Sequence, residues 1–192
     1  MVNSLTAFMH FLWAGLVMHR QTGGIVPSQR FLVAKMIAPI PEAYRGQIVE
    51  LGAGSGAITL PLAERCPSAR ILACEINPTL ARDNRHNLFK AGIDGRVKVI
   101  TGSAENLLSI MNSNGAERPD YIISSIPLRN LGGKKARALI DAISRTLGKG
   151  GMYIQFQHSQ FDQGKIRAEF PRTRTTSVFL NLPPAIVYYA QR

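Results

Sequence analysis

The feature of this sequence that most limits its fold is a regular alternation, from Gly46 onward, of short apolar segments with segments of helical spacing. Short apolar segments rich in Val and Ile are typical of buried strands, and the stretches between them are long enough for crossover helices. The predicted strands are residues 46–51, 69–76, 96–100, 119–126, 151–158, 175–182 and 184–190. The pattern predicts an α/β fold with a seven-stranded, mainly parallel sheet covered on both faces, completed by an antiparallel C-terminal hairpin.

The length of the chain allows one domain. A chain of 192 residues, 45% of them hydrophobic, can bury one core but is too short for two ordinary domains and a linker. We therefore divide it into an N-terminal apolar segment, residues 1–27, and a single α/β domain, residues 28–192. Cys66 and Cys74 lie in or beside predicted core elements without metal-ligand spacing, so we expect buried free thiols and no metal.

The charge of the chain indicates an anionic partner. Twenty-three Lys and Arg residues against twelve Asp and Glu residues give a formal net charge of +11. Such a charge suits nucleic acid or an acidic membrane surface. Two basic groups stand out, and for either of them alone a merely solvated surface is an equal alternative. They are Arg129, Lys134, Lys135 and Arg137, and then Lys165, Arg167, Arg172 and Arg174.

The N-terminal segment is almost entirely apolar between Leu5 and Met18. It is too short to cross a bilayer, which takes about 20 apolar residues. No Lys or Arg precedes Arg20, whereas a secretory signal normally begins with a basic residue. The segment predicts a helix that either docks on the domain or lies in a membrane interface with Trp13 at headgroup depth. We favour the interface.

A glycine-rich loop follows the first predicted strand. Gly52, Gly54 and Gly56 in "VELGAGSG" let the backbone turn tightly and approach a ligand without a Cβ in the way. Glu50, just before the loop, would repel a pyrophosphate but can orient a cationic amino-acid group. Glu75, at the end of the second strand, is placed to accept both hydroxyls of a ribose. Together these features point to S-adenosylmethionine as the cofactor.

Several motifs resemble those of the bacterial phospholipid N-methyltransferases: "IVELGAGSGAIT", "CEINP", "SSIPL", "NLPPAIVYY" and, further upstream, "TGGIVPSQRFLVAKM". The resemblance covers nearly the whole chain, and its motifs are partly shared with ribosomal RNA adenine dimethyltransferases and ornithine-lipid methyltransferases. It implies a Rossmann-like class I methyltransferase fold with an extra N-terminal helix over the site. It also implies successive methyl transfers to phosphatidylethanolamine, toward phosphatidylcholine, with S-adenosyl-L-homocysteine as the by-product.

These inferences also predict where the protein acts. We expect a cytoplasmic monomer, peripheral to the cytoplasmic face of the inner membrane. Its expected partners are an anionic membrane surface and an aminophospholipid substrate rather than nucleic acid.

The expected cofactor site combines the loops after the first four strands. Its residues are Glu50, Gly52, Ala53, Gly54, Ser55, Gly56, Glu75, Ile76, Ser103, Ala104, Glu105 and Ser124. Ser103 stands where related enzymes often have Asp to accept the adenine amine. Either Ser103 or Glu105 would therefore have to accept it.

Methyl transfer needs a neutral nitrogen lone pair held in line with the methyl group and its sulfur. We expect the carbonyl groups around Ser124, Ser125 and Ile126 to accept hydrogen bonds from the amine. Pro127 would fix the direction of these carbonyls because its ring limits the turn. His158, at the end of the fifth predicted strand, is the side-chain candidate for the proton, because imidazole titrates near neutral pH.

The predicted substrate site favours a lipid. Arg20 and Arg129 are candidates for a lipid phosphate, and Leu128 for lining the path of the lipid. An adenine-methylating site usually stacks a flipped base on an aromatic side chain after the Pro step, and Leu128 cannot stack in this way. We therefore favour a lipid amine. The open alternatives are a ribosomal RNA adenine N6-methyltransferase, an ornithine-lipid N-methyltransferase, and a membrane-bound S-adenosylmethionine binder without catalysis.

Overall fold

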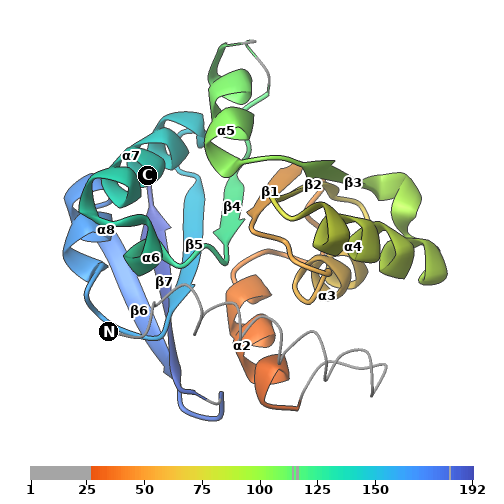
Figure 1. Ribbon diagram of the computed structural model, residues 1–192, viewed down its shortest axis with the longest axis horizontal. Coiled ribbons are helices and arrows are strands. Elements are labelled where there is room, and N and C mark those ends of the chain that lie inside the picture. Colours follow the sequence, from red (N-terminus) through yellow and green to blue (C-terminus); the bar gives the residue numbers. More distant parts are fainter. Residues whose placement is uncertain (1–26, 114, 116, 182) are drawn as a thin grey trace.

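The computed structural model describes residues 27–113, 115, 117–181 and 183–192. The predicted N-terminal helix and Arg20 lie outside the described residues. Across this described part, one seven-stranded sheet carries helices on both faces (Figure 1). None of the helices described there has the length and apolar character needed to span a bilayer.

Strands and helices alternate along the chain. The strands are β1 (Gln47–Leu51), β2 (Arg70–Glu75), β3 (Val97–Thr101), β4 (Tyr121–Ser124), β5 (Met152–Gln157), β6 (Arg172–Val178) and β7 (Ala185–Gln191). The helices are α2 (Pro27–Ile37), α3 (Thr59–Arg65), α4 (Pro78–Lys90), α5 (Ala104–Ser113), α6 (Leu128–Leu131), α7 (Gly133–Thr146) and α8 (Gln163–Glu169), with a 3-10 turn, η1 (Asp94–Arg96). All seven strands overlap their predicted segments, whereas α2, α6 and α8 were not predicted.

The order of the strands confirms the predicted sheet. The order is β3-β2-β1-β4-β5-β7-β6, with β1 to β5 parallel and β7 antiparallel to both of its neighbours. Leu51, the last residue of β1, lies opposite Cys74 of β2 and Ser124 of β4. The strand order therefore switches at this point, because β2 and β3 lie on one side of β1 whereas β4, which follows β3 in the chain, lies on the other side. Ligands of parallel α/β sheets bind at the carboxyl ends of the strands beside such a switch point.

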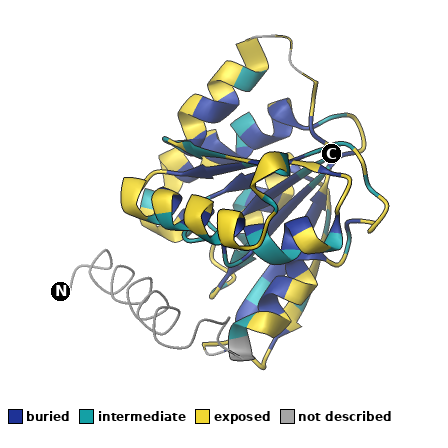
Figure 2. Cartoon of the chain, turned by 90° about the vertical axis from the view of Figure 1, so that its right-hand side faces the viewer, coloured by how far each residue is buried: buried dark blue, intermediate teal, exposed yellow. Residues whose placement is uncertain are grey.

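Two hydrophobic clusters fill the space between the sheet and its helices. Ile122 and Ile123 are neighbours in β4 but belong to opposite clusters, as the alternation of side chains along a strand requires. The first cluster draws on α2, α3 and α4, and the second on α5, α7 and α8. Figure 2 shows the result, with buried strands between helices whose outer surfaces are exposed.

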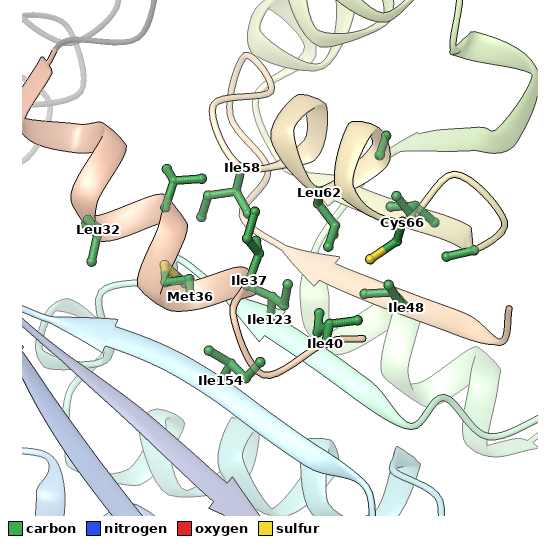
Figure 3. Close-up of a cluster of buried hydrophobic side chains, with 14 of the residues drawn as sticks. Leu32, Met36, Ile37, Ile40, Ile48, Ile58, Leu62, Cys66, Ile123 and Ile154 are labelled. Atoms are coloured by element: carbon green, nitrogen blue, oxygen red, sulfur yellow. The ribbon is translucent and has the colours of Figure 1, made fainter. Parts of the chain in front are cut away.

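Helix α2 closes one end of the first cluster. Leu32, Met36 and Ile37 of α2 are buried in this cluster, and Figure 3 shows Met36 and Ile37 near Ile123 and Ile154 of the sheet. The Tyr189 hydroxyl of β7 donates a hydrogen bond to the Lys35 carbonyl at 2.8 Å. These contacts fix α2 against the strands β5, β6 and β7.

Candidate functional site

The glycine-rich loop is held against the end of β2. The amides of Gly52 and Ala53 donate to the Cys74 carbonyl at 2.9 and 3.0 Å. The Gly54 amide donates to Glu75 Oε2 at 2.8 Å. Three consecutive amides of the loop are therefore positioned by two consecutive residues of β2, which brings the two predicted halves of the cofactor site together.

The glycines of this loop differ in what a side chain at each position would contact. All three have positive φ, at 78° for Gly52, 55° for Gly54 and 101° for Gly56. A Cβ on Gly56 would lie 2.7 Å from Asn84 Oδ1 and 2.9 Å from Leu60 Cδ1, so any side chain there would force these two neighbours to move. A Cβ on Gly54 would have no protein atom within 4 Å. The space above Gly54 is thus available to a ligand.

These two glycines provide a matched pair of variants. We expect Gly54→Ala to fold with a loss of about 1–2 kcal/mol, from the positive φ alone, and to bind S-adenosylmethionine about tenfold more weakly. We expect Gly56→Ala to lose more stability, because it adds a steric clash to the same backbone strain. Thermal unfolding and calorimetric titration of both variants measure the difference. Equal losses of stability would contradict this assignment.

Glu75 has the geometry of a ribose acceptor. Its Oε1 accepts from the Asn77 amide at 2.8 Å and its Oε2 from the Gly54 amide. A carboxylate offers about four lone-pair sites, so two remain for the two hydroxyls of a ribose. Ile76 follows with 71% of its surface exposed and offers an apolar face beside the carboxylate. These residues fit an adenosine group.

Asn77 fixes the direction in which the chain leaves Glu75. Its side chain accepts from the amides of Thr79 and Leu80 at 2.9 and 3.3 Å and so caps α4, with Pro78 in the first turn. The sequence predicts this cap. Because the Asn77 amide also bonds to Glu75, the start of α4 and the ribose acceptor form one rigid unit.

Glu50 is a fully buried carboxyl group below the loop. Its Oε2 accepts from Thr59 Oγ1 at 2.7 Å, and Asn84 Nδ2 donates to the same hydroxyl oxygen at 3.1 Å. Glu50 Oε1 has no hydrogen-bond partner among the described residues. Burial raises the pKa of Glu50 to about 8, with a smaller contribution from the charge of Glu75 and against the lowering effect of the Thr59 hydrogen bond. A cationic ligand group nearby would favour the ionised form.

The loop after β3 supplies two candidates for binding the adenine amine of the cofactor. Ser103 Oγ accepts from the Asn106 amide at 3.2 Å and therefore caps α5. Ala104 is buried, and Glu105 is exposed in the first turn of α5. The Ser103 oxygen retains one acceptor site beside its role as a cap. Both Ser103 and Glu105 stay candidates for the adenine amine.

The loop after β4 is fixed from below by two glutamine side chains. Gln155 and Gln157 of β5 are buried, and their Nε2 atoms donate to the Ile126 carbonyl at 3.1 and 3.2 Å. A carbonyl oxygen has two lone pairs, and here both are used. The Ile126 carbonyl therefore does not accept from a substrate amine in this structure, in contrast to our expectation. Ser124 Oγ accepts from the Ile126 amide at 3.2 Å, which tightens the same loop.

The other expected site residues take different positions. Ser125 continues the pairing of β1 with β4, because its amide donates to the Leu51 carbonyl at 3.0 Å. Pro127 follows in an extended conformation. Leu128 does not line a substrate path as expected: it is fully buried in the cluster with α7, because α6 turns its first residue into the core.

Arg129 is exposed and lies over the Phe161 ring, 4.7 Å from the ring centroid. His158 is exposed, and its Nδ1 lies 3.0 Å from the Pro184 carbonyl oxygen.

Four polar residues of the site were not predicted: Thr59, Asn84, Gln155 and Gln157. One signal in the sequence could have found the glutamines. They alternate within "MYIQFQ", so they share one face of a strand whose other residues are apolar or aromatic. Buried amides at such a position need partners, and the end of the neighbouring strand β4 is the nearest source.

The two glutamines carry a prediction about turnover. We expect the double variant Gln155→Leu with Gln157→Leu to lower the rate of methyl transfer about tenfold or more, because a released Ile126 peptide lets the loop leave its position. Cofactor affinity should fall less than the rate, because the side-chain amides of Gln155 and Gln157 donate to the loop after β4 and to the Phe156 carbonyl rather than to the glycine loop. Gln191→Leu, at the exposed far end of β7, is the control. A loss of cofactor affinity equal to the loss of rate would overturn this role.

Comparisons with known proteins agree with this geometry. The family model described as a methyltransferase domain matches residues 48–151. The chain is 28% identical to the ornithine lipid N-methyltransferase of Singulisphaera acidiphila over 187 residues, which cover 94% of this chain and 95% of that protein. It is 30% identical over 123 residues to the tRNA1(Val) (adenine(37)-N6)-methyltransferase of Aeromonas hydrophila, with 59% of this chain and 51% of that protein covered.

A solved structure shows the same fold. The O-methyltransferase from Bacillus cereus in complex with SAH superposes with a TM-score of 0.65 at 19% identity, over 93% of this chain and 90% of that chain. The family match covers more than half of the 192 residues. The chain therefore belongs to the methyltransferase domain family and is a class I, S-adenosylmethionine-dependent methyltransferase. The predicted cofactor agrees with this class.

Proposed function

We propose that this methyltransferase acts on the primary amine of a membrane lipid headgroup, either an ornithine lipid or phosphatidylethanolamine. The observation that carries the proposal is the loop after β4. Leu128, which directly follows Pro127, is buried in the core, and no residue from Ser124 to Arg129 is aromatic. The loop has no aromatic side chain on which a flipped base could stack, whereas an alkyl amine needs none.

The pattern of similarity supports a lipid. The lipid-methylating relative matches nearly the whole chain, including the regions before β1 and after β5. The adenine-methylating relative matches 59% of the chain. Substrate-binding elements of this fold vary more than the shared cofactor-binding half, so similarity over the whole chain carries more information about the substrate.

The residues of the site have two tasks in the proposed reaction: they bind the cofactor, and they align the amine with its methyl group. Glu75 and the glycine loop hold the adenosine end of S-adenosylmethionine, which supplies an electrophilic methyl group when bound. Backbone oxygens at Ser124 and Ser125 hold the amine and remove it from water. His158 takes the proton that the amine must lose before attack, with its ring oriented by the Pro184 carbonyl. Positioning supplies most of the rate.

A labelling experiment tests the proposal. The full-length chain is incubated with S-adenosylmethionine labelled at the methyl group and with three separate acceptors: ornithine-lipid vesicles, phosphatidylethanolamine vesicles, and a pool of ribosomal and transfer RNA. We expect label in at least one lipid arm and none in RNA. The identity of the labelled lipid selects between the two headgroups. The Glu75→Ala variant controls for transfer that does not depend on the site.

Two results of this labelling experiment would contradict the proposal. Label in RNA without label in either lipid would overturn the proposal and favour an adenine methyltransferase. Binding of the cofactor without label in any arm would also overturn it.

A further inference from the structure

Three large apolar side chains are exposed at one edge of the sheet, and we call them the apolar edge: Phe161, Phe179 and Leu180. Their exposed fractions are 74%, 80% and 66%. Single exposed apolar residues are common on protein surfaces, but a group of large ones marks an interaction site.

The topology brings these residues to the edge that carries the candidate site. Gln157, the last residue of β5, pairs with Ile186, and Val178, the last of β6, pairs with Ala185. The loop after β5 and the turn between β6 and β7 therefore leave the sheet at the same edge as the carboxyl end of β4 (Figure 1). The contact between His158 Nδ1 and the Pro184 carbonyl oxygen, at 3.0 Å, joins the two loops.

Basic residues accompany the apolar edge. Arg129 lies over the Phe161 ring, which ties α6 to the loop after β5. Helix α7 begins directly after α6. Lys134 and Lys135 are exposed in its first turn, and this turn contains no acidic residue. Cations at a helix N-terminus oppose the helix dipole, so helix stability does not account for these lysines. The segments 128–131, 158–161 and 179–181 contain no Asp or Glu.

We propose that the apolar edge inserts into the interface of an anionic lipid bilayer, with Arg129, Lys134 and Lys135 facing the headgroups. This inference rests on the proposed lipid substrate. Aromatic and Leu side chains flanked by cations are the combination that binds such interfaces, where apolar burial and charge attraction add together. Docking in this orientation turns the ends of β4 and β5 toward the headgroups, so the amine reaches the site without the lipid leaving the bilayer.

Binding of full-chain variants to lipid vesicles tests whether the apolar edge contacts the bilayer. The probe is vesicles of phosphatidylcholine containing phosphatidylglycerol. We expect the triple variant Phe161→Ser, Phe179→Ser and Leu180→Ser to bind them at least about tenfold more weakly than the native chain. The matched control is Phe89→Ser with Ile110→Ser, which removes two apolar side chains of 70% and 56% exposure from α4 and α5. The control should bind as the native chain does.

A fluorescence measurement locates the contact independently of the N-terminal segment. The only Trp of the chain, Trp13, is first replaced by Phe. Phe179→Trp in this background should shift its emission to the blue on adding vesicles, and brominated lipid should quench it. Phe89→Trp should show neither effect. Quenching at position 89 but not at position 179 would overturn the proposed orientation.

The outcomes separate this surface from the proposed function. If the triple variant bound vesicles as tightly as the native chain does, the proposal that the apolar edge inserts into the bilayer would be wrong. Methylation of aminolipid dispersed in detergent would still support the proposed lipid substrate. If the triple variant loses RNA binding and keeps vesicle binding, the edge is a nucleic-acid surface and the inference is wrong. Unchanged cofactor affinity in the triple variant shows that its fold is intact.

Discussion

Replacing Glu75 with alanine will weaken the binding of S-adenosylmethionine about a hundredfold or more, which corresponds to about 2.7 kcal/mol. The variant loses the carboxylate proposed to bind both ribose hydroxyls, and hydrogen bonds to a charged acceptor are stronger than neutral ones. It also releases the amides of Gly54 and Asn77, which both donate to Glu75 at 2.8 Å. The site therefore loses ligand contacts and its own order together. Calorimetric titration of the ligand-free protein measures the affinity.

Two further variants separate these contributions. Glu75→Gln keeps one acceptor oxygen, so its affinity for S-adenosylmethionine should lie between those of the native chain and Glu75→Ala. Glu64→Ala removes an exposed carboxylate from α3 and should leave the affinity unchanged. If Glu75→Ala kept native affinity, the cofactor would have to bind elsewhere on the chain, and the assignment of the loop after β2 would be wrong.

The buried carboxyl of Glu50 predicts that the ligand-free protein becomes less stable as pH rises from about 5 to 8. Burial raises the pKa of Glu50 from 4.5 to about 8, so the folded state holds a proton that the unfolded chain releases. The stability from this group is fully present below pH 4.5, falls through the interval, and is lost above about pH 8. The change in pKa corresponds to roughly 5 kcal/mol at most.

Glu50→Gln removes this dependence, because its amide does not titrate. We expect the unfolding free energy of the variant to change less across pH 5 to 8 than that of the native chain, and to exceed it at pH 8. Denaturant unfolding at several pH values measures both. Equal slopes in the two proteins would show that Glu50 ionises in the folded state as it does in the unfolded chain.

The sequence predicts the strands well because most of them are buried on both faces. Segments such as "IVEL" and "ILACE" are apolar apart from one glutamate and are followed by glycine or a turn, and this pattern has few alternatives. Strand β6 was placed about three residues too late. It lies at the edge of the sheet and exposes "RTRTTS", so its beginning carries no hydrophobic signal. Helices α6 and α8 are short, and their existence depends on packing against α7.

The site was predictable where it depends on backbone conformation and order along the chain. The glycine loop and Glu75 follow directly from strand ends that meet at one edge. The partners of Ile126 and Glu50 were not predictable in the same way. The Ile126 carbonyl is bonded by residues about 30 positions away, and Asn84 reaches Thr59 across 25 positions. Leu128 was misplaced because it begins α6, a four-residue helix that the sequence did not predict, and is buried in the cluster with residues of α7.

The reversal of strand order at β1 has an evolutionary consequence. The loops after β1, β2 and β3 belong to the first part of the chain, and those after β4 and β5, with the turn between β6 and β7, to the second. Within the sheet, the two stretches pair only between β1 and β4, whereas α2 and α5 also pack across this division. On the proposed function, the first stretch holds most of the methyl donor and the second holds the acceptor. Mutation or recombination downstream of residue 120 can change which molecule is methylated and leave the methyl donor untouched.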